Sequence, residues 1–262
     1  MQKIKLYQKI KIVKLICKYQ KNLPVSINIF PPKITQFESQ EQLYESAYLN
    51  LEENILSHQS HQGNCRIALS GGFTPMELYQ KIGKSPIIDW QKLEIFQTDE
   101  RFIDQNDQRS NQFQIRKSLG LEACTKLEEN FNIYWLKSDE KLEKCLDKYN
   151  EILENLDGVW FDEVILGIGS DGHIASLFPS GSYLKHQENR VIATETSVFE
   201  VTQRLSLTLE SVLNSSKITI LLVGANKSEV LQELVEGKMS AIDFPAKFLL
   251  AHPNVHILAC FE

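Results

Sequence analysis

The chain has 262 residues, 42% of them hydrophobic, which is enough to build one large core or two small ones. Its net charge of −6 is uneven, because residues 1–32 hold seven lysines and no acid, and the other 21 basic residues face 34 acidic ones. Duplex binding depends on neutralising phosphates, so this acidic body argues against a nucleic-acid partner and favours a local site for any anionic ligand.

Residues 1–32 are predicted to form a flexible basic extension, followed by a single α/β domain over residues 33–262. Lysines alternate with aliphatic residues at the start, and this stretch is too short and too charged for stable insertion across a bilayer. No uncharged core or small-residue cleavage site follows, so a secretory signal is not indicated. A membrane-surface amphipathic segment and an organellar presequence remain as alternatives.

The five cysteines are scattered and show no CxxC spacing, which predicts free thiols in a reducing compartment, the cytoplasm. His58 and His61 have a spacing that metal pairs use, but no further ligand clusters near them. We therefore expect no metal site at this pair.

The first half of the chain alternates helical and strand patterns. Leu43, Ala47, Leu51 and Ile55 recur every four positions, as on one face of an amphipathic helix. A strand is predicted over residues 66–69, and then a helix whose start carries a capping-box pattern formed by Thr74 and Glu77, with Pro75 at the first helical position. Further on, the sequence predicts a strand over 93–97, a polar loop over 98–109, a helix capped by Ser110, a strand over 131–136 and a helix over 138–156.

The second half continues the alternation. Strands are predicted over 164–166, 204–209, 217–223 and 255–260, and residues 191–194 read as an irregular region rich in β-formers. A helix is predicted over 226–236 and is stopped by Gly237. Strands that alternate with helices of ten or more residues indicate βαβ units, and hence an α/β fold with a doubly wound, mainly parallel sheet flanked by helices.

The stretch VILGIGSDGHIASLFP, residues 164–179, joins a buried strand to a glycine-rich turn. Ligands of open α/β sheets bind at the carboxyl ends of the strands, where this turn lies. His173 has the chemistry to exchange a proton near neutral pH, and Asp171 stands where it can orient the imidazole or balance its charge.

Three matches to known nucleotide-binding or catalytic motifs, two in this turn and one earlier in the chain, are weak. GIGSDG matches the dinucleotide pattern GxGxxG, but Pro179 and Gly181 interrupt the helix that the pattern requires. Gly83, Lys84 and Ser85 resemble the end of a P-loop without its first glycine. A nucleophile elbow around Ser170 lacks the second flanking glycine.

Two further loops suggest an anion site at the same sheet edge. SGGFTP, residues 70–75, leads from a strand into a helix start, where free N–H groups and the helix dipole favour phosphate. TDER, residues 98–101, follows the next strand. Loops at one edge of a sheet converge, so we expect them to meet the His173 turn.

Taken in order, SGGFTP, TDER followed by Ser110 and Asn111, GIGSDGHIASLFP, RLSLTL and GANK resemble the 6-phosphogluconolactonase family, which is similar to the sugar-phosphate deaminases and isomerases. The resemblance spans about residues 65–251 and implies a Rossmann-like α/β fold. It also implies hydrolysis of 6-phospho-D-glucono-1,5-lactone to 6-phosphogluconate, in the oxidative pentose phosphate pathway, with this phosphosugar lactone as the small-molecule partner.

The same resemblance implies residue roles. His173 resembles the general base that activates water, and Asp171 would hold the loop and the imidazole. A mechanism of this kind implies neither a metal nor an organic cofactor. The implied substrate-binding residues are Ser70, Gly71, Gly72, Asp99, Arg101, Gly169, Gly172, Arg204 and Lys227. Arginine suits phosphate because its planar fork bonds two oxygens, and backbone N–H groups near residues 169–172 would steady the oxyanion.

Two departures and two rivals accompany this interpretation. Phe73 stands where family members commonly have a small or polar residue, and Ile174 where lactonases often have threonine. A glucosamine-6-phosphate deaminase is one rival, but its ring-opening glutamate would fall at Phe178, which carries no proton acceptor. A non-catalytic sugar-phosphate sensor is the other, and the residues before the first helix show no helix-turn-helix pattern.

Overall fold

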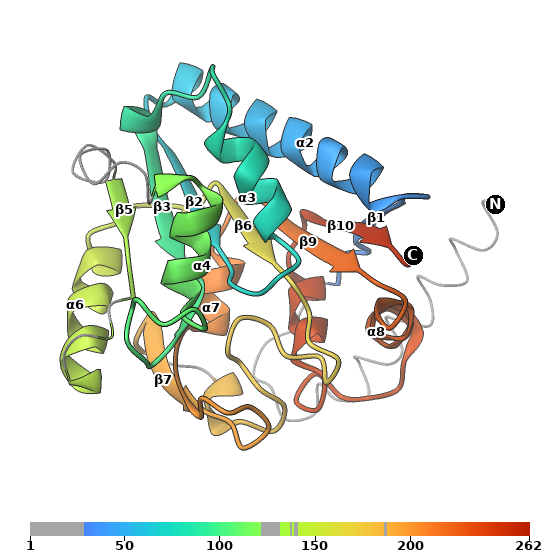
Figure 1. Cartoon of the computed structure of the whole chain (residues 1–262). Helices are drawn as coiled ribbons and strands as arrows, with labels where there is room; N and C mark the ends of the chain where they lie inside the picture. Colours follow the sequence, from blue (N-terminus) through green and yellow to red (C-terminus); the bar gives the residue numbers. More distant parts are fainter. Residues whose placement is uncertain (1–28, 122–131, 137, 139–140, 186–187) are drawn as a thin grey trace.

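The computed structural model describes residues 29–121, 132–136, 138, 141–185 and 188–262. Seven strands form a sheet in which every neighbouring pair runs parallel, in the order β1-β10-β9-β6-β2-β3-β5 (Figure 1). Their bounds are β1 Lys33–Gln36, β2 Cys65–Leu69, β3 Leu93–Gln97, β5 Asn132–Tyr134, β6 Glu163–Leu166, β9 Ile218–Val223 and β10 Val255–Cys260. The predicted doubly wound α/β fold is confirmed.

Helices cover both faces of this sheet and enclose a hydrophobic core on each side (Figure 1). One core contains side chains of α2 Gln40–His61, α3 Met76–Gly83 and α4 Asn111–Ser118. The other contains side chains of α6 Leu142–Glu154, α7 Leu209–Leu213, α8 Lys227–Glu236 and the 3-10 helix Pro245–Ala251. Strand β6 shows the alternation, since Val164 and Leu166 face the second core and Ile165 faces the first.

After the edge strand β1, the chain crosses to the central strand β2 and later returns to its neighbour β6; from these two strands it moves outward in opposite directions. From β2 it continues to β3 and β5, whereas from β6 it continues to β9 and β10. The loops that follow β2 and β6 therefore diverge at a topological switch point, where α/β sheets bind their ligands.

A second sheet of three antiparallel strands, in the order β4-β8-β7, lies beyond this edge. Its strands are β4 Asp99–Arg101, β7 Val191–Glu195 and β8 Gln203–Leu207. The interpretation of residues 98–109 as a polar loop was therefore wrong at its start, because residues 99–101 pair with β8. The predicted strand over 204–209 is confirmed with a small shift of its ends. Residues 191–194, expected to be irregular, instead form a regular strand, because they pair with β8 along their whole length.

Other local predictions need correction. The capping box at Thr74 does not form, since α3 begins at Met76 after Pro75 and no side chain caps it. Ser110 does cap α4, accepting a hydrogen bond of 3.2 Å from the N–H of Phe113. The helix predicted over 138–156 is shorter, and the sequence analysis missed β1 and α7.

The predicted basic extension lies largely outside the described residues, because residues 1–28 are not among them. Residues 29–32 are described, and the N–H of Phe30 donates to the carbonyl of Leu250 at 2.8 Å. Strand β1 then starts at Lys33, on the edge beside β10. The division into an extension and a single domain stays a prediction.

Helix α2 offers a matched pair of leucines for measuring how much its packing stabilises the fold. Leu51 is 1% exposed against the sheet, whereas Leu49 on the same helix is 52% exposed. We expect Leu51→Ala to lower the free energy of unfolding by about 2–5 kcal/mol, through lost burial and the cavity that remains. Leu49→Ala should change it by no more than about 0.5 kcal/mol in the same denaturant titration. Equal effects of the two substitutions would contradict this packing.

The lowered pKa of His256 leads us to expect that the protein loses stability at acidic pH. Burial first, and then the positive charges of Lys33 and Lys217, lower the pKa of His256 from 6.5 to about 4. Between these values the unfolded chain takes up a proton that the folded chain refuses, so stability present above pH 6.5 is lost as the pH falls toward 4. We expect His256→Gln, which can keep the contact with Thr35, to flatten this part of the stability curve in urea titrations. An unchanged slope would exclude His256 as its source.

Candidate active site

His173 and Asp171 form a hydrogen-bonded pair in the turn after β6. The Nδ1 atom of His173 lies 2.5 Å from Oδ1 of Asp171, and the backbone N–H of His173 donates to the same oxygen at 3.2 Å. A carboxylate at Nδ1 favours the tautomer with its proton there, which leaves Nε2 as a proton acceptor. Burial opposes ionisation of Asp171, but its hydrogen bonds and attraction to His173 outweigh burial, so its pKa lies below the ordinary value.

Two glycines give this turn its shape. A Cβ on Gly169 would lie 2.1 Å from Nδ1 of His173, so only glycine allows the imidazole to fold back over the turn. Gly172 has a φ of +85°, a conformation that L side chains rarely adopt, and it packs against the ring of Phe244. The N–H of Gly169 donates to the carbonyl of His173, and that of Gly172 to the carbonyl of Gly169. These two N–H groups are therefore bonded within the turn, and the oxyanion role expected near residues 169–172 stays a prediction.

The second sheet places two arginines side by side. Arg101 of β4 and Arg204 of β8 are directly paired across the antiparallel ladder. Like charges in such a pair repel, and an anion between or beside them removes that repulsion. Burial, and then the charge of Arg101, lower the pKa of Arg204, while Asp99 opposes the shift. The register of this small sheet therefore brings two cations together, which makes them a candidate anion site.

Lys227 adds a third cation from the first turn of α8. Its Nζ donates to the carbonyl of Ile168 at 2.7 Å, which directs it toward the turn that carries His173. Burial lowers the pKa of Lys227, and the negative charge of Asp171 partly opposes this. The lysine thus places a positive charge beside the turn that carries His173, in the same pocket as the two arginines.

The loop after β2 contributes Ser70, Gly71 and Gly72. Ser70 is buried, and its Oγ has no hydrogen-bond partner among the described residues. A Cβ on Gly71 would lie 2.0 Å from Oδ1 of Asn111, so glycine lets α4 approach this loop closely. Phe73, the departure in this loop, is 92% exposed and lies on the wall of the candidate pocket described below.

A buried carboxylate fixes the loop that carries Arg101. Oε1 of Glu100 accepts hydrogen bonds from the N–H groups of Arg101 and Asn111, both at 2.7 Å. Its Oε2 accepts from Gln97, Ser110 and the N–H of Gln112. Burial raises the pKa of Glu100 despite these donors. Asp99 points the other way and accepts from Oγ of Ser176 at 2.7 Å.

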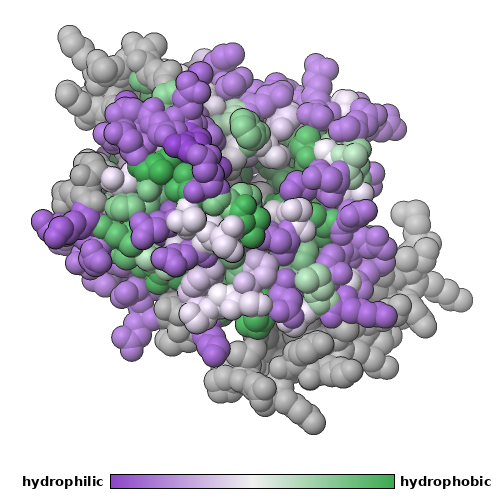
Figure 2. Space-filling model, turned by 60° about the horizontal axis from the view of Figure 1, so that its bottom comes forward, coloured by the Kyte–Doolittle hydropathy of each residue, from purple (hydrophilic) through white to green (hydrophobic). Residues whose placement is uncertain are grey.

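These groups surround one pocket of about 390 Å³ at the carboxyl edge of the parallel sheet. Figure 2 turns this edge forward and shows hydrophilic and hydrophobic residues interspersed on it. The candidate residues that line the pocket are Ser70, Gly71, Gly72, Asp99, Arg101, Gly169, His173, Arg204 and Lys227. Asp171 and Gly172 stand behind the wall and shape it. The predicted convergence of the loops is therefore confirmed.

The pocket wall also contains residues to which the sequence analysis assigned no binding or catalytic role, among them Asn111, Ser176, Phe178 and Phe199. Asn111 was visible within the family pattern, but only the structure shows that its amide donates to the carbonyl of Asp99 at 2.9 Å. Phe199 lies in the β7–β8 hairpin, and no pattern in the sequence identified it. Its position depends on the pairing of two strands.

In the described part of the chain, no three His, Cys, Asp or Glu side chains are grouped as metal ligands. Within the same residues, no helix is both long enough and apolar enough to cross a membrane.

Comparisons with known proteins agree with this geometry. A solved 6-phosphogluconolactonase from Shewanella baltica OS155 has the same fold, with a TM-score of 0.79 and 24% identity, over 89% of this chain and 100% of that one. A monomeric glucosamine-6-phosphate deaminase also shares the fold, with a TM-score of 0.73 and 21% identity, over 87% and 97% of the two chains. The fold alone therefore does not separate the two activities.

Sequence similarity identifies the family. A relative from Haemophilus influenzae, described as 6-phosphogluconolactonase, is 31% identical over 205 residues, which are 76% of this chain and 84% of the relative. The family model for glucosamine-6-phosphate isomerases and 6-phosphogluconolactonase matches residues 38–257. The chain is therefore a member of the glucosamine-6-phosphate isomerase/6-phosphogluconolactonase family.

Proposed function

We propose that this protein hydrolyses 6-phospho-D-glucono-1,5-lactone to 6-phosphogluconate, a step of the oxidative pentose phosphate pathway. The observation that carries the proposal is the His173–Asp171 pair in the same pocket as Arg101, Arg204 and Lys227. This arrangement joins a proton acceptor to a site for a dianionic group, which a phosphorylated lactone requires.

In the proposed mechanism, the phosphate binds near Arg101 and Arg204 and thereby orients the lactone carbonyl toward His173. A water molecule gives a proton to Nε2 of His173 as its oxygen bonds to C1 of the lactone. The tetrahedral intermediate then collapses, the bond between C1 and the ring oxygen breaks, and His173 returns the proton to that oxygen. Asp171 keeps the imidazole in the required tautomer and stabilises its charged form.

The pocket favours hydrolysis of a lactone over deamination of an amino sugar. Five residues after His173 stands Phe178, buried, with its ring centroid 5.0 Å from that of the imidazole. A carboxylate at this place could take part in sugar ring opening, but a phenyl ring has no atom that accepts a proton. We therefore propose the lactonase activity for this member of the family.

The substrate is a small, highly polar metabolite, and we propose no nucleic-acid partner and no stable membrane insertion. In the described part of the chain, Cys65 and Cys260 are free, buried thiols, which fits the expected reducing compartment. We propose the cytoplasm as its location on this ground.

Replacement of His173 tests the catalytic role. We expect His173→Ala to lower kcat for the phosphorylated lactone by about 10²–10⁴-fold, because water loses its proton acceptor. The measurement is NMR or stopped-flow decay of freshly made lactone, corrected for spontaneous hydrolysis. His61→Ala, at an exposed histidine at the end of α2, should keep the wild-type rate.

Two results would count against the lactonase assignment. One is a wild-type decay no faster than buffer alone. The other is release of ammonium from glucosamine 6-phosphate at a rate comparable with a deaminase, which would make the isomerase branch of the family the better description.

Replacement of Arg101 tests the phosphate site. We expect Arg101→Ala to raise KM for the phosphorylated lactone by about 10–100-fold, because charge-assisted hydrogen bonds to phosphate are lost. Hydrolysis of unphosphorylated glucono-1,5-lactone should be nearly unaffected. Arg101→Lys should fall between the two, since it keeps the charge without the planar fork. Lys92→Ala removes one positive charge from an exposed position before β3 and serves as the control. An equal loss for both lactones would contradict the phosphate role of Arg101.

A further inference from the structure

The β7–β8 hairpin loop, residues 196–202, places an aromatic ring beside both His173 and Arg204. Phe199 is 41% exposed and lines the pocket wall. Its ring centroid lies 5.7 Å from that of His173, in an edge-on arrangement, and the guanidinium carbon of Arg204 lies 5.6 Å from it. One side chain thus touches the candidate base and a candidate phosphate ligand.

Arg204 depends on this loop for its direction. Its Nε donates to the carbonyl of Val201 at 2.9 Å, and its guanidinium faces the ring of Phe199. A cation over an aromatic ring is attracted by the negative face of the ring. Across the strand pair, Arg101 repels it. The loop therefore contacts Arg204 through both Val201 and Phe199, and these contacts oppose its repulsion by Arg101.

The same ring encloses the imidazole of His173. Phe178 lies 5.0 Å from His173, and Phe199 lies 6.0 Å from Phe178, so the three rings form a cluster. Aromatic neighbours in edge-on and tilted arrangements limit the rotation of the imidazole and keep bulk water from its side. The direction of Nε2 is thereby coupled to the position of the hairpin loop.

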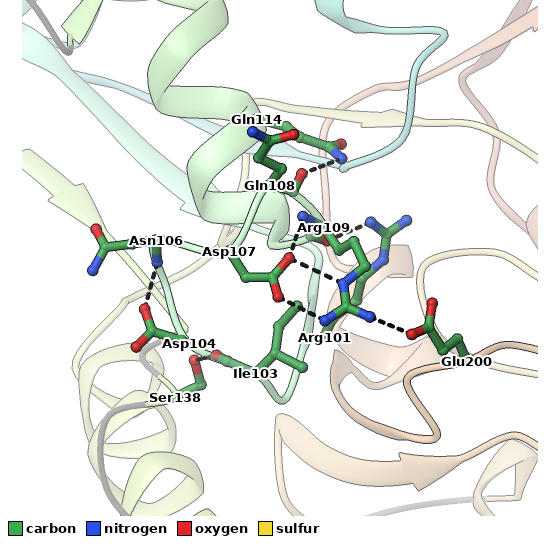
Figure 3. Close-up of polar contacts among 10 residues, drawn as sticks. All are labelled: Arg101, Ile103, Asp104, Asn106, Asp107, Gln108, Arg109, Gln114, Ser138 and Glu200. Carbon is green, nitrogen blue, oxygen red and sulfur yellow. Dashed lines mark hydrogen bonds and ion pairs between the residues drawn. The ribbon is translucent and has the colours of Figure 1, made fainter.

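The loop has little packing of its own, because a second hollow of about 730 Å³ lies against it, lined by residues that include Glu195, Ser197, Glu200 and Thr202. An ion pair spans the gap between this loop and the loop after β4: Arg109 lies 2.6 Å from Glu200 and 2.7 Å from Asp107 (Figure 3). The guanidinium of Arg101 also donates to the carbonyl of Arg109. The β7–β8 hairpin loop and the loop after β4 are thus tied together through Arg109.

We propose that Phe199 is a positioning residue that aligns Arg204 with His173 for a phosphorylated substrate, and that the Arg109–Glu200 ion pair holds Phe199 in place. This inference rests on the proposed function for its kinetic consequences, but its binding consequences can be measured without turnover.

The first test compares Phe199→Ala with Val198→Ala. Val198 is the adjacent residue, 74% exposed and outside the pocket wall, so its truncation controls for changes of the loop surface. Calorimetry with 6-phosphogluconate should show affinity about three- to thirtyfold weaker for Phe199→Ala, since the aromatic contact with the cation is lost. Val198→Ala should bind like wild type. Equal affinity of the two variants would overturn the proposal.

Conservative variants separate the ring from its bulk. Phe199→Tyr keeps the ring and should restore binding, and the pH profile of kcat for the lactone should also match wild type. Phe199→Leu keeps apolar volume without the negative ring face and should bind as weakly as Phe199→Ala. Full restoration by leucine would show that volume alone matters, and would overturn the aromatic positioning of Arg204.

The ion pair is tested by its dependence on Phe199. Glu200→Gln should weaken binding by about twofold, and less so at high salt, as for an exposed ion pair. Glu195→Gln, an exposed acid in the same hairpin, should have no effect. In a Phe199→Ala background, Glu200→Gln should add nothing, because the pair acts through the ring. An additive effect would overturn the holding role of the pair.

Failure of the wider function remains distinguishable in these experiments. If wild type binds 6-phosphogluconate but does not hydrolyse the lactone, the proposed function fails while the affinities of the Phe199 variants still decide the positioning role. If wild type binds neither 6-phosphogluconate nor inorganic phosphate, both proposals are overturned.

Discussion

The carboxylate of Glu100 is the interaction on which the geometry of this site depends most directly. It accepts hydrogen bonds from Arg101, from the first two N–H groups of α4, and from the side chains of Gln97 and Ser110. A buried carboxylate is costly unless its oxygens are fully bonded, and this one satisfies donors that would otherwise be unpaired. The same carboxylate therefore contacts the last residue of β3, bonds the first N–H groups of α4 and fixes the backbone of Arg101.

The two sheets contribute to the site in different ways. The parallel sheet supplies loops at its switch point, and these carry the reactive turn and the glycines that let it fold closely. The antiparallel sheet supplies charge, because its register sets Arg101 opposite Arg204. Base and anion ligands are thus placed by separate elements, and the hairpin loop with Phe199 lies where these elements meet.

The sequence was sufficient for much of this. Buried apolar runs and amphipathic spacing identified most strands and helices, and glycine, histidine and arginine at strand ends identified most of the pocket. The three-residue strand β4 was missed because its residues, Asp99 to Arg101, are polar and its partner β8 lies about a hundred residues away. The pattern at Thr74 predicted a cap that Pro75 displaces.

Contacts made only in the folded chain account for the remainder. The role of Glu100 follows from burial beside a helix start, which local composition does not reveal. Phe199 meets His173 only because β7 and β8 pair, and a lone phenylalanine in a polar loop carries no periodic signal. The site roles of His173, Asp171 and the basic residues stay predictions, although their convergence in one pocket supports them.

The facing arginines have a consequence for the protein as a whole. The two cations repel each other in the folded protein, and an anion bound beside them would reduce this repulsion. Any ligand that binds only the folded form also stabilises that form by mass action. A ligand in the pocket would then raise the free energy of unfolding in addition to any part it takes in the reaction. On the proposed function, a phosphorylated ligand in this pocket would therefore also raise the resistance of the folded chain to unfolding.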